Sequence, residues 1–361
     1  MRFLLFAFTP GPDAMLKLIA AALNAILHKA VVLKTGAPIE NDAVDRVDEC
    51  DALVLGGPDS AYPEHQRRLV ERALSLGKPI IILEDIPGSS RRPWFKEYAP
   101  RVRQVLLAMP GEQWKQQSSD HGYPEVLHVA LPPHWGVAYE AMTSGMSKEA
   151  LRRSFQKYRG NVSMPLAAED RVVFFNGIKN HPINTTIIRL MREAGERVLE
   201  DRFVMGFRPH PREPEDGAAV ALREKLLQGV WLLETGEATQ PQIIKSVDIP
   251  VFTGGATDSI VAAYARLIPA HYVDGTVVEY MEHEGGHKDG KWFVAELGGV
   301  YPIRSQEQFE PALRVLLSPE GQEELHRTQE ANFPPPFPSS ETARAIAKHL
   351  VVSLSKKNLS L

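Results

Sequence analysis

The chain has 361 residues, of which 43% are hydrophobic and 24% are charged, a composition typical of globular proteins and a length that suggests two domains. Its net charge of −4 argues against a nucleic-acid-binding protein, which would normally carry an excess of basic residues. Cys50 is the only cysteine, so no intramolecular disulfide can form, and this fits a reducing compartment such as the cytoplasm.

The first half of the chain alternates strand-like and helix-like segments. Residues 2–9 form a continuous apolar run, as in a parallel strand buried on both faces. The run lacks the hydrophobic region and cleavage site of a signal peptide, and no segment approaches the roughly 18 apolar residues of a membrane span. Further strands are expected at 30–33, 52–55, 79–83 and 105–109, and helices after Asp13 and at 64–75. The alternation predicts a doubly wound parallel sheet.

The second half restarts this alternation after a looser middle. Residues 147–158 predict a helix and 161–168 a connection, so we place the domain boundary near residue 165. Asn180 can cap a helix that Gly195 ends. Strands are expected at 171–175, 203–207, 229–233, 249–253, 271–273 and 293–297, and helices at 308–317 and 340–352. We therefore expect two α/β domains, residues 1–165 and 166–335, and a C-terminal helix within 336–361 that can cross back to the first domain.

The strongest functional signal follows the strand at 249–253, where two glycines precede a helix. Glycines let the backbone approach a ligand closely, and the free N–H groups of a helix start attract an anion. The alternative is an ordinary turn capped by Thr257 or Asp258, and the Asp258 carboxylate would repel a phosphate. The residues expected to bind phosphate are Gly254, Gly255, Ala256, Thr257 and Ser259.

A second polar loop, residues 208–213, follows another predicted strand. Two prolines stiffen it and present Arg208, His210 and Arg212 together. Arginine suits bidentate contact with phosphate, and histidine can act as an acid or a base near neutral pH. The pattern therefore predicts two phosphate-binding arginines and a catalytic His210. The alternative is a rigid, solvated turn held by ion pairs.

A third loop follows the strand at 171–175. Lys179 in this loop could neutralise the charge of a phosphate, although simple helix capping by Asn180 would also explain the segment. Ligands of open α/β sheets bind outside the carboxyl ends of the strands, and all three loops occupy such positions. We therefore expect the three loops to form one phosphate site.

The three loops together resemble those of an enzyme family named below, and this resemblance implies that the first domain supplies the acceptor site and any catalytic base. We prefer Asp85 as the general base, because a carboxylate at the end of a strand beside a glycine turn can take a hydroxyl proton. On the acceptor side we expect Thr9, Asp13, Gly57 and His134. The alternatives are turn capping by either aspartate and core packing of the histidine.

Residues 283–287 match H-E-x-x-H, the signature of zinc proteases, in which a helix presents both histidines on one face. Here both spacers are glycines, each of which costs about 1 kcal/mol in a helix, and the flank at 288–291 is typical of a turn. Phe293 stands where a metzincin has its third histidine. We therefore interpret the segment as a His-rich loop and expect no metal site.

In this order, the strand ending in Asn176-Gly177, the Arg-Pro-His-Pro loop and the Thr-Gly-Gly-Ala-Thr-Asp-Ser segment resemble the nucleotide-binding half of GT-B glycosyltransferases, over about residues 170–310. They are similar also to UDP-N-acetylglucosamine 2-epimerases and CDP-glycerol glycerophosphotransferases. The resemblance implies two Rossmann-like domains facing each other across a cleft, with a nucleotide diphosphate held mainly by the C-terminal domain. It also implies a metal-independent reaction, with His210 and the N–H groups of 255–257 near the diphosphate.

The chain departs from the GT-B pattern at two places. Many such enzymes hold the ribose with a Glu whose slot falls here at Ala262 or Ala263, and Leu267 replaces the glycine usual before the final proline. We expect a glycosyltransferase-like enzyme with a nucleotide-diphosphate-linked donor as substrate and no further cofactor, acting as a monomer or homodimer. The alternatives are a nucleotide-sugar 2-epimerase-like enzyme, which needs no acceptor, and a non-catalytic nucleotide- or sugar-binding protein, which the missing ribose Glu suggests.

Overall fold

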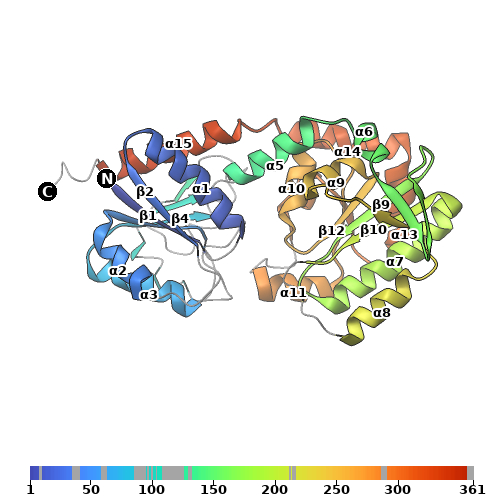
Figure 1. Ribbon diagram of the computed structural model, residues 1–361, viewed down its shortest axis with the longest axis horizontal. Coiled ribbons are helices and arrows are strands. Elements are labelled where there is room, and N and C mark those ends of the chain that lie inside the picture. The colour runs from blue at the N-terminus through green and yellow to red at the C-terminus, as the bar shows by residue number, and fades with distance from the viewer. Residues whose placement is uncertain are drawn as a thin grey trace. The chain divides into compact units, whose positions relative to one another are not determined.

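The computed structural model describes residues 1–7, 10–34, 41–57, 63–84, 104–107, 126–128, 132–210, 217–285 and 291–355, with the single positions 95, 97, 98, 101, 102 and 213. The chain divides into two compact units (Figure 1). Unit 1 contains Met1–Val137, Glu284–Gly286 and Pro336–Leu361, and unit 2 contains Ala138–His283 and His287–Pro335. The division precedes the boundary expected near residue 165, because residues 156–165 pair with the sheet of unit 2.

A parallel sheet forms the centre of unit 1. Its strands are β1 Arg2–Ala7, β2 Lys29–Lys34, β3 Ala52–Leu55, β4 Ile80–Glu84, β5 Gln104–Leu107 and β6 Val126–His128. Their spatial order is β2-β1-β3-β4-β5-β6. Every residue of β3 and β4 is buried, as expected where helices cover both faces of a parallel sheet.

Helices cover both faces of this sheet (Figure 1). The helices α1 Pro10–Ala25 and α15 Ser339–Ser355 pack together on one face, while α2 Asn41–Glu49 and α3 Pro63–Ser75 lie on the other. The last helix of the chain therefore completes the core of the unit in which the chain begins. That core is mostly aliphatic and includes Leu5, Ile19, Leu23, Val54, Ile81, Ile346 and Leu350. The helix α5 Pro133–Thr143 carries the chain from unit 1 into unit 2.

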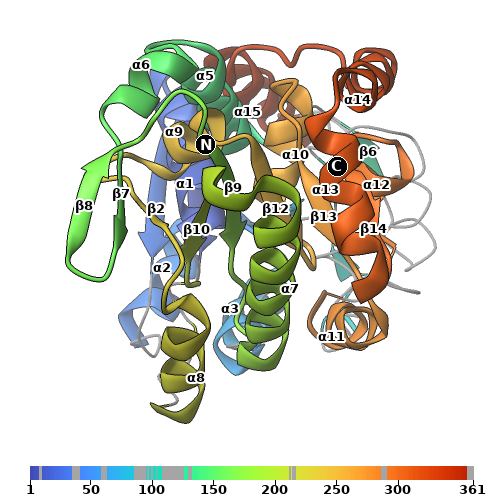
Figure 2. The ribbon, with the colours of Figure 1, turned by 90° about the vertical axis from the view of Figure 1, so that its right-hand side faces the viewer.

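The sheet of unit 2 has eight strands (Figure 2). The parallel strands are β9 Arg171–Asn176, β10 Phe203–Arg208, β11 Leu232–Glu234, β12 Ile249–Thr253, β13 Ala270–Tyr272 and β14 Tyr301–Ile303. A hairpin of β7 Gln156–Arg159 and β8 Val162–Pro165 pairs antiparallel with β11. The spatial order is β14-β13-β12-β9-β10-β11-β7-β8. Both halves of the chain thus have the doubly wound α/β class that the alternation predicts.

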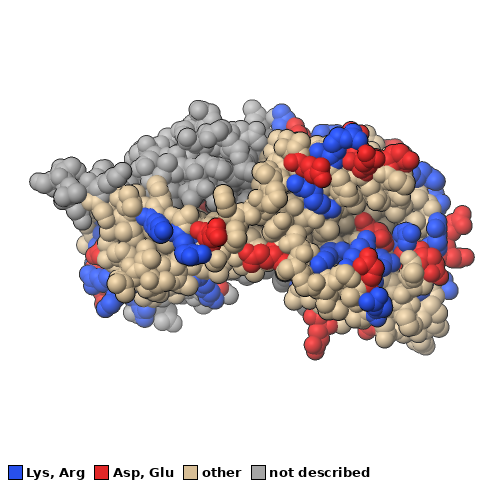
Figure 3. Space-filling view, turned by 90° about the horizontal axis from the view of Figure 1, so that it is seen from above, with Lys and Arg blue, Asp and Glu red and all other residues tan. Residues whose placement is uncertain are grey.

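The helices that follow α5 belong mostly to unit 2. They are α6 Lys148–Arg153, α7 His181–Leu199, α8 Gly217–Leu227, α9 Gln240–Ser246, α10 Thr257–Tyr264, α11 Gly275–Gly285, α12 Phe293–Glu296, α13 Phe309–Leu317 and α14 Pro319–Asn332. Among the described residues, no helix has the length and apolar character to cross a lipid bilayer. On the face seen in Figure 3, the basic side chains of unit 2 (right) are interspersed with acidic ones rather than gathered into one patch.

The helix predicted at 147–158 is wrong in its second half. The helix α6 ends at Arg153 and β7 begins at Gln156. Lys157 of β7 is buried, and its Nζ lies 2.6 Å from Oδ1 of Asp170 and 5.1 Å from the ring centre of Trp231. A charged segment that is typical of an exposed helix is therefore a strand, because distant residues satisfy its buried lysine.

The predicted helix after Asn180 is confirmed at its start and wrong at its end. The Asn180 side chain accepts a hydrogen bond from the N–H of Ile183 at 3.1 Å, as an N-cap residue does. The helix α7 then passes through Gly195 and continues to Leu199. A Cβ atom at Gly195 would lie 2.4 Å from the ring of Phe203, so this glycine permits close packing of α7 on β10.

The strand predicted at 293–297 is also wrong, because this segment forms the short helix α12. Phe293 and Val294 are buried, and Trp292 just before them is buried as well. Short apolar runs do not distinguish a buried strand from a buried helix by periodicity alone. The buried partners of Trp292, described below, lie in the first turn of α10 and in β13.

Candidate functional site

The three polar loops predicted to bind phosphate lie at the carboxyl edge of the unit 2 sheet. They follow β12, β9 and β10, which are neighbours in that order. The register pairs Asn176 with Arg208 and Phe175 with Val251. The chain runs outward from β9 through β10 and β11 and then returns to β12 on the other side of β9. This reversal is a topological switch point, the place where open α/β sheets bind ligands.

The loop after β12 presents backbone N–H groups at the start of α10. Gly254 has a φ of +61°, a conformation that favours glycine. Within the described part of the chain, the N–H groups of Gly255, Ala256 and Thr257 donate no hydrogen bond. Ala256 is the N-cap residue and makes no side-chain cap bond, so neither Thr257 nor Asp258 caps this helix. Unsatisfied amides at a helix start form a site for an anion.

Ser259 faces the interior rather than a ligand. The residue is fully buried, and both its N–H and its Oγ donate to the carbonyl oxygen of Ala256, at 3.1 Å and 2.6 Å. The Oγ atom in turn accepts a hydrogen bond of 2.9 Å from Nε1 of Trp292. The predicted role of Ser259 as a phosphate ligand is therefore corrected, because both of its donors are engaged inside the loop.

Asp258, the carboxylate that a phosphate would avoid, is bonded within unit 2. Its Oδ2 accepts hydrogen bonds from Nδ2 of Asn176 at 3.0 Å and from Nε2 of Gln240 at 2.8 Å. The Oε1 of Gln240 accepts a further hydrogen bond from Arg208. Burial raises the pKa of Asp258, while the bond from Gln240 and the charge of Arg208 act in the opposite direction. Asp258 thus joins the first turn of α10 to the end of β9 and to the first turn of α9.

The loop after β10 is held by Glu213, which we did not select from the sequence. Its side chain is 4% exposed, accepts a hydrogen bond from Nδ2 of Asn184 at 2.8 Å and lies 2.6 Å from Nδ1 of His181. Arg223 of α8 lies 3.4 Å away. The Glu213 N–H donates to the carbonyl oxygen of His210 at 2.8 Å. One buried carboxylate therefore joins α7 and α8 to the loop that carries His210.

Basic side chains stand in the neighbouring loops at the same edge of the sheet. Arg208 is exposed at the end of β10, and Lys179 and His210 are partly exposed in the neighbouring loops. The carboxyl edge of the sheet therefore combines unsatisfied N–H groups with positive charge, which suits a phosphate group. Three predicted site residues lie outside the described residues: Thr9, Asp85 and Arg212.

The predicted acceptor-side residues that the structure describes belong to unit 1. Asp13 is buried in the first turn of α1, 2.9 Å from Nζ of Lys17. Gly57 follows β3 with a φ of +64°. His134 lies in the first turn of α5, where burial lowers its pKa to about 3, so that its ring is neutral at physiological pH. Each residue lies near the end of a strand or the start of a helix.

The segment interpreted as a His-rich loop is helical at its start. Residues 283–285 form the last turn of α11, which ends at Gly285. Gly286 and His287 lie outside the described residues, so the second histidine of the H-E-x-x-H match is not placed. Among the described residues, no group of three or more histidine, cysteine, aspartate or glutamate side chains is arranged to hold a metal ion.

The two positions expected for a ribose-binding Glu do not line the loop. Ala262 and Ala263 are both fully buried within α10, two turns or less from its N-terminus. Neither side chain could reach a ligand at the carboxyl edge of the sheet without displacing core residues.

No family model matches the chain, and no curated protein matches it in sequence. Solved structures match it in fold. MnaA from S. aureus, solved with UDP, has a TM-score of 0.65 at 13% identity, over 98% of this chain and 97% of that one. The UDP-GlcNAc 2-epimerase from Neisseria meningitidis, bound to UDP-GlcNAc, has a TM-score of 0.65 at 13% identity, over 97% and 100%. MurG from Acinetobacter baumannii has a TM-score of 0.55 at 11% identity, over 96% and 100%.

These likenesses extend over nearly the whole chain and show its fold. The protein has two Rossmann-like, doubly wound α/β domains of the GT-B type, as the order of its motifs predicts. At identities of 11% to 13% the comparisons show the fold of the chain and do not show its activity. The chemistry has to be argued from the loops of unit 2.

Proposed function

We propose that unit 2 binds the diphosphate of a nucleotide-linked sugar and that the protein is a glycosyltransferase-like enzyme acting on this donor. The observation that carries the proposal is the set of free N–H groups of Gly255, Ala256 and Thr257 at the switch point of the sheet. Such amides bind a diphosphate through hydrogen bonds and through the dipole of the helix. The fold is shared with proteins solved in complex with UDP and UDP-GlcNAc, which supports this ligand class.

The same groups would assist the transfer. As the sugar leaves, negative charge develops on the departing diphosphate, and fixed donors stabilise this charge more strongly than they stabilise the bound substrate. Lys179, Arg208 and Arg212 would add positive charge, and His210 would donate a hydrogen bond or a proton. We propose no metal ion or cofactor for this step, with Asp85 as the base that activates the acceptor. The acceptor side would comprise Thr9, Asp13, Gly57 and His134.

The ligand class is tested by thermal unfolding in the presence of UDP, GDP, CDP or ADP, each beside its nucleoside. A ligand at 100 times its Kd stabilises the folded state by about 2.7 kcal/mol, which raises the unfolding midpoint. We expect at least one diphosphate to raise the midpoint, and its nucleoside to raise it less. If none of the four diphosphates raises it, the proposal is wrong.

The amide site is tested by Thr257→Pro, which removes one N–H and leaves the loop otherwise intact. Proline is tolerated at the first position of a helix, and Ala256 before it has the extended conformation, with a φ of −69° and a ψ of 110°, that a residue before proline requires. We expect Kd for the stabilising diphosphate to rise about tenfold by calorimetric titration, since a charged acceptor loses one hydrogen bond. Thr257→Ala keeps the N–H and is the matched control; equal Kd in both variants would remove this amide from the site.

A second candidate is a nucleotide-sugar 2-epimerase-like enzyme. It is favoured by the TM-score of 0.65 with the Neisseria meningitidis epimerase, compared with 0.55 for MurG. Incubation with UDP-GlcNAc alone separates the candidates, because an epimerase forms a new sugar isomer without any acceptor. A protein that binds the nucleotide but forms no product with or without acceptors would be the non-catalytic binding protein.

We further propose that the enzyme works in the cytoplasm as a monomer or homodimer. Its single cysteine, Cys50, is buried and free, which suits a reducing compartment. On the face of unit 2 seen in Figure 3 the charges are interspersed, which supports a small-molecule substrate there rather than a nucleic acid. Sedimentation of the purified chain would distinguish the two oligomeric states.

A further inference from the structure

The first carbonyl of the loop before α10 is anchored by a buried histidine. His271 of β13 is 1% exposed, and its Nε2 lies 2.7 Å from the carbonyl oxygen of Gly254. Burial lowers the pKa of His271 to about 4, so the ring is neutral at physiological pH. A carbonyl oxygen can only accept a hydrogen bond, and Nε2 must therefore carry the proton of the neutral ring.

A second carbonyl of the loop, that of Ala256, is anchored by two hydrogen bonds in sequence. Trp292 donates from Nε1 to Oγ of Ser259 at 2.9 Å, and Ser259 donates from Oγ to the carbonyl oxygen of Ala256 at 2.6 Å. The indole N–H is a donor only, so it fixes the direction of the chain. Trp292 orients the single hydroxyl proton of Ser259 toward Ala256.

The two anchors determine where the free amides point. In a trans peptide unit the C=O and the following N–H lie in one plane and point in opposite directions, and the described chain contains no cis peptide bond. Because the Gly254 carbonyl points to His271, the N–H of Gly255 points away from it. Because the Ala256 carbonyl points to Ser259, the N–H of Thr257 points away from the helix interior.

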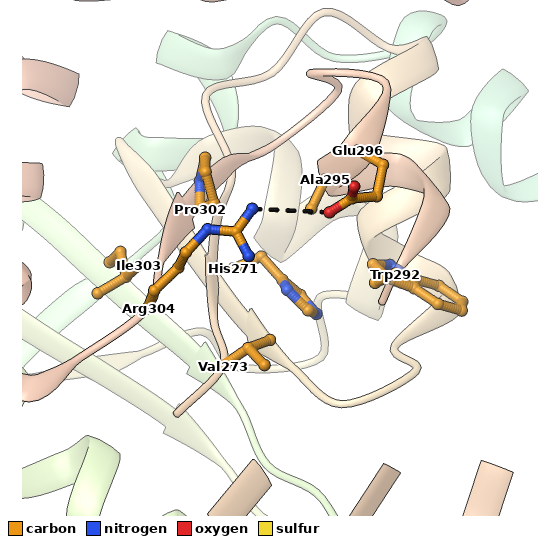
Figure 4. Close-up of a pocket in the computed structure, with 8 residues that line it drawn as sticks. All are labelled: His271, Val273, Trp292, Ala295, Glu296, Pro302, Ile303 and Arg304. Atoms are coloured by element: carbon orange, nitrogen blue, oxygen red, sulfur yellow. Dashed lines mark ion pairs between the residues drawn. The ribbon is translucent and has the colours of Figure 1, made fainter. Parts of the chain in front are cut away.

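The anchors also contact each other, so they form one buried unit. The rings of His271 and Trp292 are stacked, with centroids 6.5 Å apart and planes inclined by 19°. Figure 4 shows both rings below the ion pair of Arg304 and Glu296, whose charged atoms are 3.6 Å apart. The pocket that these four residues help to line has a volume of about 20 Å³, room for about one water molecule. No sugar or nucleotide fits in a pocket of this size.

We propose that His271, Trp292 and Ser259 are positioning residues that aim the N–H groups of Gly255 and Thr257 at a bound diphosphate. The inference rests on the diphosphate site proposed above and assigns each anchor its own amide. Removal of the His271 donor should mainly disturb Gly255, and removal of the Trp292 donor should mainly disturb Thr257. A purely structural role would lower stability without this selectivity.

The test is a titration of ¹⁵N-labelled protein with inorganic pyrophosphate, a probe that needs no particular base or sugar. In the native protein we expect the amide resonances of Gly255 and Thr257 to shift on binding. His271→Leu should weaken pyrophosphate about fivefold, the equivalent of one hydrogen bond, and reduce the Gly255 response most. Trp292→Phe, which keeps most of the ring packing, should reduce the Thr257 response most. His271→Gln retains an N–H donor and should bind nearly as the native protein does.

Thr253→Val is the matched control. It removes a buried hydrogen bond of 2.7 Å from Oγ1 of Thr253 to the carbonyl oxygen of Tyr272. This bond joins β12 to β13, but it is not one of the bonds that anchor the loop. We expect it to lower stability and to leave pyrophosphate affinity unchanged. If the native amides respond while His271→Leu and Trp292→Phe bind pyrophosphate as Thr253→Val does, the positioning role is wrong and the diphosphate site stands. If the native amides do not respond at all, the diphosphate site itself is wrong, and the positioning role fails with it.

Discussion

His271 makes the stability of unit 2 depend on pH. Burial lowers its pKa to about 4, the Gly254 carbonyl acts in the opposite direction, and the nearby Arg304 lowers it further. In the unfolded chain the same ring takes up a proton below about pH 6.5. The stabilisation is therefore complete above pH 6.5 and is lost as the pH falls toward 4.

Between pH 7 and 5 we expect the free energy of unfolding to fall about 2 kcal/mol more in the native protein than in His271→Gln, measured by urea denaturation. Glutamine keeps a donor but does not titrate, so the difference between the two curves isolates this ring. His134, whose pKa burial lowers to about 3, titrates equally in both proteins and cancels. If the free energy of unfolding falls equally with pH in both proteins, His271 is not a buried neutral ring.

Some residues of the candidate site could be predicted from the sequence, but their hydrogen-bond partners could not. The glycines and the Arg-Pro-His-Pro segment are visible because they follow predicted strands directly, and the structure brings their loops to one edge. The partners of Ser259 and Glu213 are not visible, since Trp292 lies 33 residues from the former and Asn184 lies 29 residues from the latter. Short polar residues can face a ligand or the interior, and only the tertiary partners decide.

Within unit 2, Gly195 determines how closely α7 approaches β10. In an isolated helix Gly195→Ala would be favourable by about 1 kcal/mol. Here the added Cβ would lie 2.4 Å from the ring of Phe203, so we expect overpacking to exceed this gain and the variant to lose about 1 to 2 kcal/mol of stability.

Chemical denaturation of Gly195→Ala beside Gly217→Ala provides the comparison. A Cβ at Gly217, at the start of α8, would meet no atom within 4 Å, and this variant should be neutral or slightly stabilised. If Gly195→Ala is stabilised as well, the helix can shift from the strand, and the glycine serves no packing purpose.

Elements with a clear hydrophobic period were predictable, and those decided by distant contacts were not. The strands β3, β10 and β12, each beside β1 or β9, were placed within a few residues, because nearly all of their residues are buried. The hairpin of β7 and β8 was missed because its buried Lys157 is paired with Asp170, which lies outside the hairpin, and because β7 pairs with the distant strand β11. The helix α12 was mistaken for a strand because its apolar run is too short to show the hydrophobic periodicity of a helix.

The molecule as a whole repeats one architecture twice, and this repetition was predictable because each half alternates strands and helices. The resemblance to GT-B proteins added the pairing of two Rossmann-like domains, which the solved structures bear out. The return of the C-terminal helix to the first unit was expected from the same resemblance. The chain leaves unit 1 after Val137 and returns from Pro336, so residues far apart in sequence share one core.

Because the two ends of the chain share one core, we expect a substitution near the C-terminus to destabilise the sheet of unit 1. Leu350 of α15 is fully buried against the core that includes Leu5 and Val54, and Leu350→Ala should cost unit 1 about 2 to 4 kcal/mol through the cavity it leaves. Hydrogen exchange should then show faster exchange of amides in β1 and β3, with β9 and β12 unchanged, because units of a protein can open separately. Val352→Ala, at a position 49% exposed on the same helix, should alter neither sheet. Equal loss of protection in both sheets would instead mean that the two units unfold as one.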